Sequence, residues 1–200
     1  MQLNNKEKML YVHIPRTGGS WFSYNWPYAD RSDTYIKNNG LGRHGKLSGI
    51  LRKLDGMKFD YNDFRIVTTV REPMDRIASS WVWFSKVKGT ALKHGWKTID
   101  DMLDEYESGA IRVNYLPQTH WLCEENAKFD IIYRFEDLLE NSYLPQRDFK
   151  TFGTGETSSK QLIRQGQNRT SLLTASQKER IQKIYKDDFD FLSRYYKDSI

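Results

Sequence analysis

Hydrophobic residues along the chain occur in two patterns: short apolar runs, and longer stretches in which apolar positions recur every three or four residues. The short runs predict buried strands over residues 10–14, 65–70 and 129–135. The longer stretches predict helices over residues 45–55, from Pro73, over 98–106 and from Thr174 onward. Strands that alternate with helices indicate an α/β fold with a central, mainly parallel sheet flanked by helices on both faces. We expect residues 1–200 to form a single domain, since this length suits one hydrophobic core.

The first predicted strand leads into His13-Ile-Pro-Arg-Thr-Gly-Gly-Ser-Trp21, a stretch suited to binding an anion. Pro15 ends the strand, and the two glycines permit positive φ at little steric cost. Ser20 suits the N-cap of a helix, whose first N–H groups and dipole attract a phosphate or another oxyanion. Arg16 and Thr17 add a guanidinium and a hydroxyl. Ordinary strand-to-helix connections use the same turn residues, so this stretch alone leaves both interpretations open.

A second stretch repeats the pattern, because an apolar strand ends at Arg71 and a helix begins at Pro73. Proline is favoured at the first position of a helix, where its missing N–H is not needed. Apolar residues at helical spacing then predict a buried face: Met74, Ile77, Ala78, Trp81 and Phe84. Ser79 lies off that face, about two turns beyond the start of the helix. Arg71 and Ser79 can therefore hold two sides of a second phosphate.

Together these stretches resemble the sulfotransferases that use 3′-phosphoadenosine 5′-phosphosulfate (PAPS), in particular the carbohydrate-modifying branch. In that family the first motif reads approximately His-Ile-Pro-Lys-Thr-Gly-Gly-Thr-Ser and holds the 5′-phosphosulfate; here it corresponds to residues 13–21. The second motif, Arg-Glu-Pro-x-x-Arg followed by a serine, binds the 3′-phosphate and corresponds to residues 71–79. The resemblance covers nearly the whole chain and implies a P-loop-like nucleotide-binding topology. One difference is that Arg16 replaces the family lysine that stabilises the leaving bridge oxygen.

The resemblance implies an enzyme that transfers a sulfuryl group from PAPS to an acceptor hydroxyl, expected on a saccharide, and releases adenosine 3′,5′-bisphosphate. It implies the following donor-binding residues: Arg16, Thr17, Gly18, Gly19, Ser20, Trp21, Arg71, Ser79 and Arg169. Arg169 is included because residues 167–171 resemble the family loop that closes over the adenosine and its 3′-phosphate. No metal is expected, because arginines and helix amides take the place of Mg²⁺. No specific nucleic-acid partner is expected either.

Two histidines are candidates for the catalytic base. Transfer to a hydroxyl needs a base near the attacking oxygen, and a neutral imidazole suits that role near pH 7. His44 is the first candidate, because related enzymes often carry a histidine after the first helix; the alternative is a surface histidine in a glycine-rich turn. His120 is the second, since the Pro-Gln before it resembles a family segment that lines the acceptor cleft.

Composition fits this interpretation without establishing it. The formal net charge of +5 and the pI of about 9.1 suit an enzyme with an anionic donor. They also suit a basic module that binds nucleic acid or another polyanion. The single cysteine, Cys123, excludes an internal disulfide. The first residues contain no apolar run, so we expect a cytoplasmic protein without a signal peptide or membrane anchor.

A Mg²⁺-dependent nucleotide or nucleoside kinase is a further alternative, because it would use an anion site of the same kind. Residues 40–46 match the first seven positions of the nucleotide-binding P-loop. Leu47, however, stands where a Ser or Thr must reach Mg²⁺. The pairing of Arg71 with Ser79 favours a sulfotransferase over both the kinase and the polyanion-binding module.

Three local expectations concern segments outside the two motifs. Residues 86–97 are predicted to form a basic loop. Thr98 is predicted to cap the next helix, with Asp101 three residues later. Arg134 is expected to brace the donor pocket or to pair with Glu136 or Asp137.

Overall fold

The computed structural model describes seven segments of the chain, which belong to two compact units. The described residues are 2–5, 7–19, 44–86, 90–110, 113–123, 128–138 and 169–197. Unit 1 comprises Met1–Val70 and His120–Gln165, and unit 2 comprises Arg71–Thr119 and Gly166–Ile200. Outside the described residues lie the segment 20–43, which includes the helix expected from Ser20, and residues 139–168.

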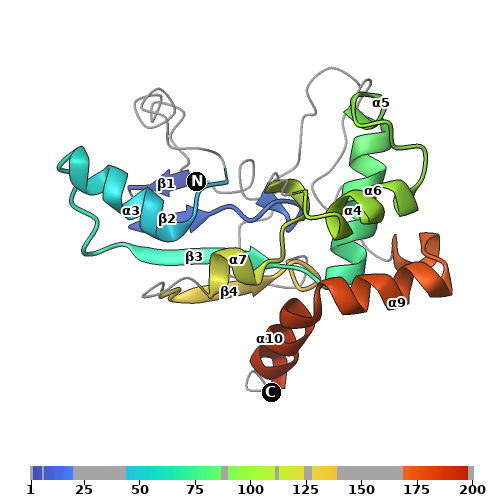
Figure 1. The fold of residues 1–200 in the computed structure, drawn as a ribbon. Coiled ribbons are helices and arrows are strands. Elements are labelled where there is room, and N and C mark those ends of the chain that lie inside the picture. The colour runs from blue at the N-terminus through green and yellow to red at the C-terminus, as the bar shows by residue number, and fades with distance from the viewer. Residues whose placement is uncertain are drawn as a thin grey trace, which may run out of the picture. The chain divides into compact units, whose positions relative to one another are not determined.

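Unit 1 contains a sheet with the strand order β1-β2-β3-β4, and its strands lie side by side in Figure 1. The strands are β1 (Gln2–Asn4), β2 (Met9–Val12), β3 (Arg65–Val70) and β4 (Ile131–Arg134). β2 pairs parallel with β3, and β3 pairs parallel with β4, so the expected mainly parallel sheet is confirmed. The short antiparallel strand β1 was not expected, because three residues are too few to show an alternating pattern.

Both faces of this sheet are packed, because successive side chains of a strand point to opposite faces. Helix α3 (Leu47–Gly56) lies against one face, close to its expected position. The core on that face is Leu3, Leu10, Val12, Leu47, Ile50, Leu54 and Phe64. The smaller core on the other face is Tyr11, Val67, Phe135 and Leu138.

Unit 2 is helical. Its helices are α4 (Pro73–Lys86), α5 (Thr90–Lys93), α6 (Ile99–Glu107), η1 (Val113–Tyr115), η2 (Arg169–Leu172), α9 (Ala175–Ile184) and α10 (Lys186–Lys197). The short helix α7 (Thr119–Leu122) begins at Thr119, which belongs to unit 2, and its other residues belong to unit 1. Helix α4 begins at Pro73, as predicted. The buried members of its core are Ile77, Ala78, Phe84, Trp96, Ile99, Met102, Leu103, Tyr115, Leu173, Ile181 and Tyr185.

Local signals at the helix ends of unit 2 are partly confirmed. Thr98 caps α6 in a full capping box with Asp101, as predicted. The predicted loop over 86–97 instead contains α5, and Trp96 is buried in the core. The stretch after Thr174 is two helices rather than one, with a break at Tyr185. Tyr185 is buried and donates a hydrogen bond to the carbonyl of Tyr115, a contact that no local pattern reveals.

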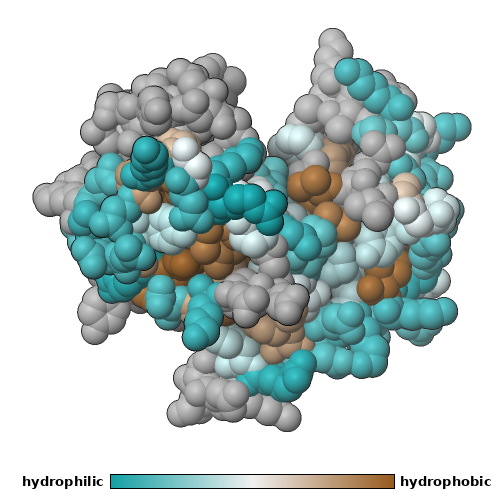
Figure 2. All heavy atoms as spheres, turned by 60° about the vertical axis from the view of Figure 1, so that its left-hand side comes forward, coloured by the Kyte–Doolittle hydropathy of each residue, from teal (hydrophilic) through white to brown (hydrophobic). Residues whose placement is uncertain are grey.

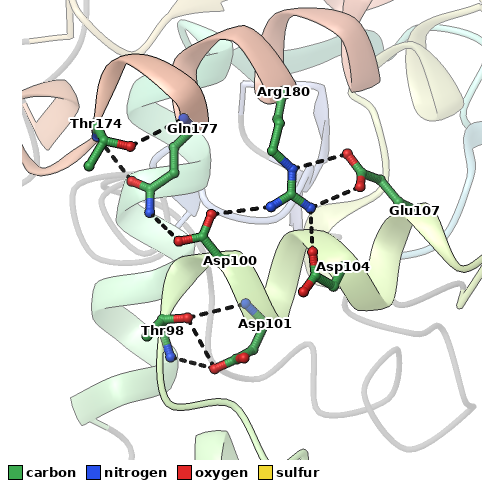
Figure 3. Close-up of polar contacts among 8 residues, drawn as sticks. All are labelled: Thr98, Asp100, Asp101, Asp104, Glu107, Thr174, Gln177 and Arg180. Carbon is green, nitrogen blue, oxygen red and sulfur yellow. Dashed lines mark hydrogen bonds and ion pairs between the residues drawn. The ribbon is translucent and has the colours of Figure 1, made fainter.

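Helices α6 and α9 are held together by Arg180 (Figure 3). Its guanidinium lies 3.1 Å from Asp100 Oδ1, 2.6 Å from Asp104 Oδ1 and 2.8 Å from Glu107 Oε2. Gln177 adds a 2.8 Å hydrogen bond from Nε2 to Asp100 Oδ2. These contacts raise the pKa of Arg180, chiefly through its hydrogen bond with Glu107. The acidic residues of α6 therefore serve a structural contact.

On the face drawn in Figure 2, hydrophilic residues predominate and hydrophobic residues gather in a few patches. Among the described residues, the exposed large hydrophobic side chains are Trp83, Val113 and Leu172, all in unit 2. In the part of the chain that the structure describes, every helix is too short or too polar to cross a membrane.

Candidate active site

Residues 13–19, which follow β2 in unit 1, form a loop anchored by buried hydroxyl groups. Thr17 Oγ1 donates a hydrogen bond to the carbonyl oxygen of Ile14 at 2.9 Å and lies 3.0 Å from Thr69 Oγ1 on β3. The Tyr11 hydroxyl lies 2.7 Å from Thr69 Oγ1. Because Thr17 gives its only hydroxyl proton to Ile14, Thr69 donates to Thr17 and Tyr11 donates to Thr69. The Thr17 hydroxyl thus braces the loop, and the amide is the Thr17 group suited to an anion.

The backbone of this loop turns sharply at two positions. Arg16 has φ of 67° and Gly18 has φ of 99°. The left-handed region costs an L-residue such as Arg16 about 1–2 kcal/mol, and residues held in this way cluster at functional sites. Left-handed residues within a turn direct successive N–H groups toward one side, which forms an anion-binding concavity. The half-buried Arg16 adds its guanidinium charge to this loop.

Both glycines of the loop are required by close approach of other groups. A Cβ at Gly19 would lie 1.9 Å from His13 Nε2. A Cβ at Gly18 would lie 2.9 Å from Phe135 Cδ2, and its φ is positive as well. The sequence predicted freedom of φ for both residues, whereas the requirement at Gly19 is contact with the His13 ring. Ser20 and Trp21, the remaining residues of the motif, lie outside the described residues.

His44 lies beside this loop, also in unit 1. Its Nδ1 is 3.3 Å from the carbonyl oxygen of His13, and the two imidazole rings are 4.6 Å apart. A carbonyl oxygen only accepts hydrogen bonds, so we assign the proton of the neutral His44 ring to Nδ1. The basic nitrogen of this tautomer is Nε2. The structure thus brings His44 to the predicted anion-binding loop.

Trp121 contacts the segment that carries His44. Its indole Nε1 donates a 3.2 Å hydrogen bond to the carbonyl oxygen of His44, and its side chain is buried. The ring of His120 packs edge-on against Trp121, with 5.0 Å between the ring centroids. The backbone of His44 and the ring of His120 therefore contact the same indole.

Unit 2 contains the residues predicted to bind a second phosphate, at and after the start of α4. Arg71 is 2% exposed and binds Asp75 Oδ2 through Nε at 2.9 Å and Nη2 at 2.6 Å. The other oxygen of Asp75 accepts a 2.6 Å hydrogen bond from the backbone N–H of Arg169. Ser79 is buried on the same helix. The structure thus connects Arg71 to Arg169 through Asp75, a residue that the sequence reasoning had not singled out.

A buried glutamine holds the backbone of Arg71. Gln118 Oε1 accepts from the Arg71 N–H at 2.9 Å, and Gln118 Nε2 donates to the Arg71 carbonyl oxygen at 2.8 Å. Asp188 in turn accepts from the N–H groups of Gln118 and Thr119 at 2.7 and 2.8 Å. The Pro-Gln pair was the one sequence signal for Gln118, and it pointed to a different role.

Burial lowers the pKa of two arginines in unit 2, because desolvation disfavours the charged form. It lowers the pKa of the fully buried Arg76, while the charge of Asp188 opposes this shift. It also lowers the pKa of Arg169, again opposed by an acid, Asp75. Arginine remains protonated in proteins, so these residues stay cationic at neutral pH.

Strand β4 ends in an exposed ion pair. Arg134 Nε lies 3.3 Å from Asp137 Oδ2, which agrees with one of the two partners expected from the sequence. Among the residues that the structure describes, no three His, Cys, Asp or Glu side chains form a group suited to a metal ion.

The fold and the loop together define the class of the protein. A parallel α/β sheet in which one strand leads into a glycine-containing turn with left-handed residues is an arrangement suited to binding an anion. Within this class, the chain matches the sulfotransferase family over residues 1–196, and it belongs to that family. Its chemistry is therefore the transfer of a sulfuryl group. A comparison with curated proteins found no match, and a comparison with solved structures found none either.

Proposed function

We propose that this protein transfers a sulfuryl group from PAPS to an acceptor hydroxyl on a saccharide. The observation that carries the proposal is the braced loop 13–19, with its left-handed Arg16 and its two glycines in close contact. Its N–H groups and guanidinium are the donors that a phosphosulfate requires, so the residues fit the donor. The saccharide, the PAPS donor and a P-loop-like nucleotide-binding topology rest on the motif resemblance.

The phosphosulfate end of the donor is assigned to unit 1. PAPS supplies the activated sulfuryl group and leaves as adenosine 3′,5′-bisphosphate. Arg16 and the amides of residues 17–20 bind the anionic oxygens, and Trp21 borders them. Arg16 also stabilises the charge that develops on the bridge oxygen, through hydrogen bonding and charge alone, because a guanidinium does not give up its proton.

The 3′-phosphate is assigned to residues of unit 2. Arg71 supplies a guanidinium, Ser79 a hydroxyl and Arg169 a second cation. This group distinguishes PAPS from adenosine 5′-phosphosulfate, which lacks the 3′-phosphate. The contact of Asp75 with both Arg71 and Arg169 supports a common role for these two residues.

The acceptor hydroxyl loses its proton to His44 in this proposal. Because His44 Nδ1 donates to the His13 carbonyl oxygen, Nε2 is the atom that takes up the proton. The position of His44 beside the loop 13–19 supports this assignment. His120 is the second candidate, and it borders Trp121, the residue that holds the His44 carbonyl.

Calorimetric titration tests the donor. We expect adenosine 3′,5′-bisphosphate to bind at least about tenfold more tightly than 5′-AMP, which corresponds to about 1.4 kcal/mol or more. Equal affinities would refute PAPS as the donor. A screen of saccharides with labelled PAPS then identifies the acceptor. A metal chelator should leave turnover unchanged, whereas a Mg²⁺-dependent kinase would lose its activity.

Replacement of Arg16 tests the proposed catalytic cation. Arg16→Ala should abolish sulfuryl transfer, because it removes the guanidinium assigned to the phosphosulfate and the bridge oxygen. It should leave the fold intact, because the side chain is only half-buried and alanine adopts the same backbone conformation at no greater cost. Arg52→Ala is the matched control, since Arg52 is an exposed arginine of the same unit. Near-normal turnover in Arg16→Ala, measured with labelled donor, would reject the role of Arg16.

A further inference from the structure

We propose that Asp75 is the positioning residue of the 3′-phosphate group, holding the guanidinium of Arg71 and the backbone of Arg169 in a single arrangement. This inference rests on the proposed function, which assigns Arg71 and Arg169 to the 3′-phosphate. Asp75 itself does not contact the nucleotide. It acts through the two residues that do.

The carboxylate of Asp75 divides its two oxygens between these residues. Oδ2 accepts from Nε and Nη2 of Arg71, at 2.9 and 2.6 Å. Oδ1 accepts from the N–H of Arg169 at 2.6 Å, across 94 positions of sequence. Asp75 is itself held, because its own N–H donates to Glu72 Oε2 at 2.7 Å and its side chain is buried. One fixed carboxylate therefore determines where both residues lie.

The contact with Asp75 also determines which edge of the Arg71 guanidinium meets a ligand. A guanidinium is planar and carries its five N–H donors in a rigid fork. Asp75 binds the side that carries Nε and Nη2, so the edge formed by Nη1 and Nη2 faces another direction. That edge is one of those that bind a phosphate with two parallel hydrogen bonds.

The backbone of Arg71 has a separate support. Gln118 binds both the N–H and the carbonyl oxygen of Arg71, at 2.9 and 2.8 Å. A change at Asp75 therefore acts mainly on the side chain of Arg71, while Gln118 still holds its main chain. This separation makes the role of Asp75 testable by substitution.

Asp75 has two opposing effects on phosphate binding. Its contacts orient Arg71 and Arg169, which favours binding, and its negative charge repels the phosphate, which disfavours binding. A long arginine side chain loses rotamer freedom when it binds, and a fixed carboxylate removes that cost before the ligand arrives. In Asp75→Asn the amide accepts from only one of its two present partners, and its NH₂ group meets an N–H donor at the other. Loss of orientation then weakens 3′-phosphate binding. Removal of a competing charge would strengthen it.

The experiment compares two nucleotides on three proteins: the unaltered chain, Asp75→Asn and the control Asp100→Asn. Asp100 is a matched control because its carboxylate also joins two partners, Arg180 and Gln177 of α9 (Figure 3). Calorimetry gives the ratio of the dissociation constant of 5′-AMP to that of adenosine 3′,5′-bisphosphate. We expect this ratio to fall about tenfold in Asp75→Asn, since hydrogen bonds to charged groups are lost. It should stay unchanged in Asp100→Asn.

The ratio separates positioning from a structural role, because general loss of structure weakens the binding of both nucleotides alike. A ratio that is unchanged or higher in Asp75→Asn overturns the inference while the proposed function stands. If the unaltered chain shows no preference for the 3′-phosphate, the proposed function fails and the inference fails with it. Should Asp75→Asn not fold, Asp75→Glu decides: it keeps the charge but displaces the carboxylate by one methylene. The same fall is expected, and a retained ratio overturns the inference.

Discussion

The contact between Gly19 and His13 makes a strong prediction about the donor loop. In Gly19→Ala the new Cβ would lie 1.9, 2.1 and 2.4 Å from Nε2, Cδ2 and Cε1 of His13. Ordinary contact begins at 3.4 Å, so the ring must retreat by about 1.5 Å, the difference between 3.4 and 1.9 Å. The ring is 6% exposed and has the His44 ring 4.6 Å away, so it has little room to move.

Two opposing contributions determine how much Gly19→Ala changes the free energy of unfolding. Overpacking of a buried site costs about 1–3 kcal/mol. Replacement of glycine by alanine also restricts the unfolded chain, which offsets about 0.5–1 kcal/mol of the overpacking cost. We therefore expect Gly19→Ala to lower the free energy of unfolding by about 1–2 kcal/mol, measured by urea denaturation. Because the displaced ring contacts His44, turnover should fall as well.

Two further variants test whether the His13 ring is the cause. Gly49→Ala is the matched control, because Gly49 lies in helix α3 and a Cβ added there would meet nothing within 4 Å. That substitution should raise stability by about 0.5–1 kcal/mol. In His13→Ala/Gly19→Ala the collision is absent, so the two single effects should not add. Additive effects, or a Gly19→Ala protein as stable as Gly49→Ala, would refute the reasoning.

Three other predictions concern the base, the indole that contacts its backbone, and the contact between α6 and α9. His44→Ala should lower turnover about 10²-fold or more; an unchanged pH–rate profile in that variant would transfer the role to His120. Trp121→Phe keeps an aromatic side chain but removes the indole N–H and its hydrogen bond to the His44 carbonyl oxygen, so kcat should fall about fivefold with little change in the KM for the donor. Arg180→Gln should lower the free energy of unfolding by about 1–2 kcal/mol, from three partly exposed ion pairs, without affecting turnover. Because Arg180 lowers the pKa of Glu107, the stability that this variant loses is present above the ordinary value of 4.5 and disappears in acid. Urea denaturation at several pH values checks this, and a difference that persists unchanged at low pH would contradict it.

Several features of the protein were readable from the sequence, because neighbouring residues determine them. The apolar runs located three of the four strands, and Pro73 marked the first residue of α4. The capping box between Thr98 and Asp101 was predictable because its two hydrogen bonds join residues three positions apart. The two motifs were sufficient to indicate the sulfotransferase family, which the comparison over residues 1–196 confirms.

The tertiary structure decided which partners the buried polar groups find. Asp75 bonds to Arg169 across 94 positions of sequence, and Gln118 bonds to Arg71 across 47. Gly19 is required because the His13 ring packs against it, not only because a turn needs glycine. Local periodicity indicates that a residue is buried but not what lies opposite. A buried polar group must still find a partner, and only the packing of distant segments determines which one it meets.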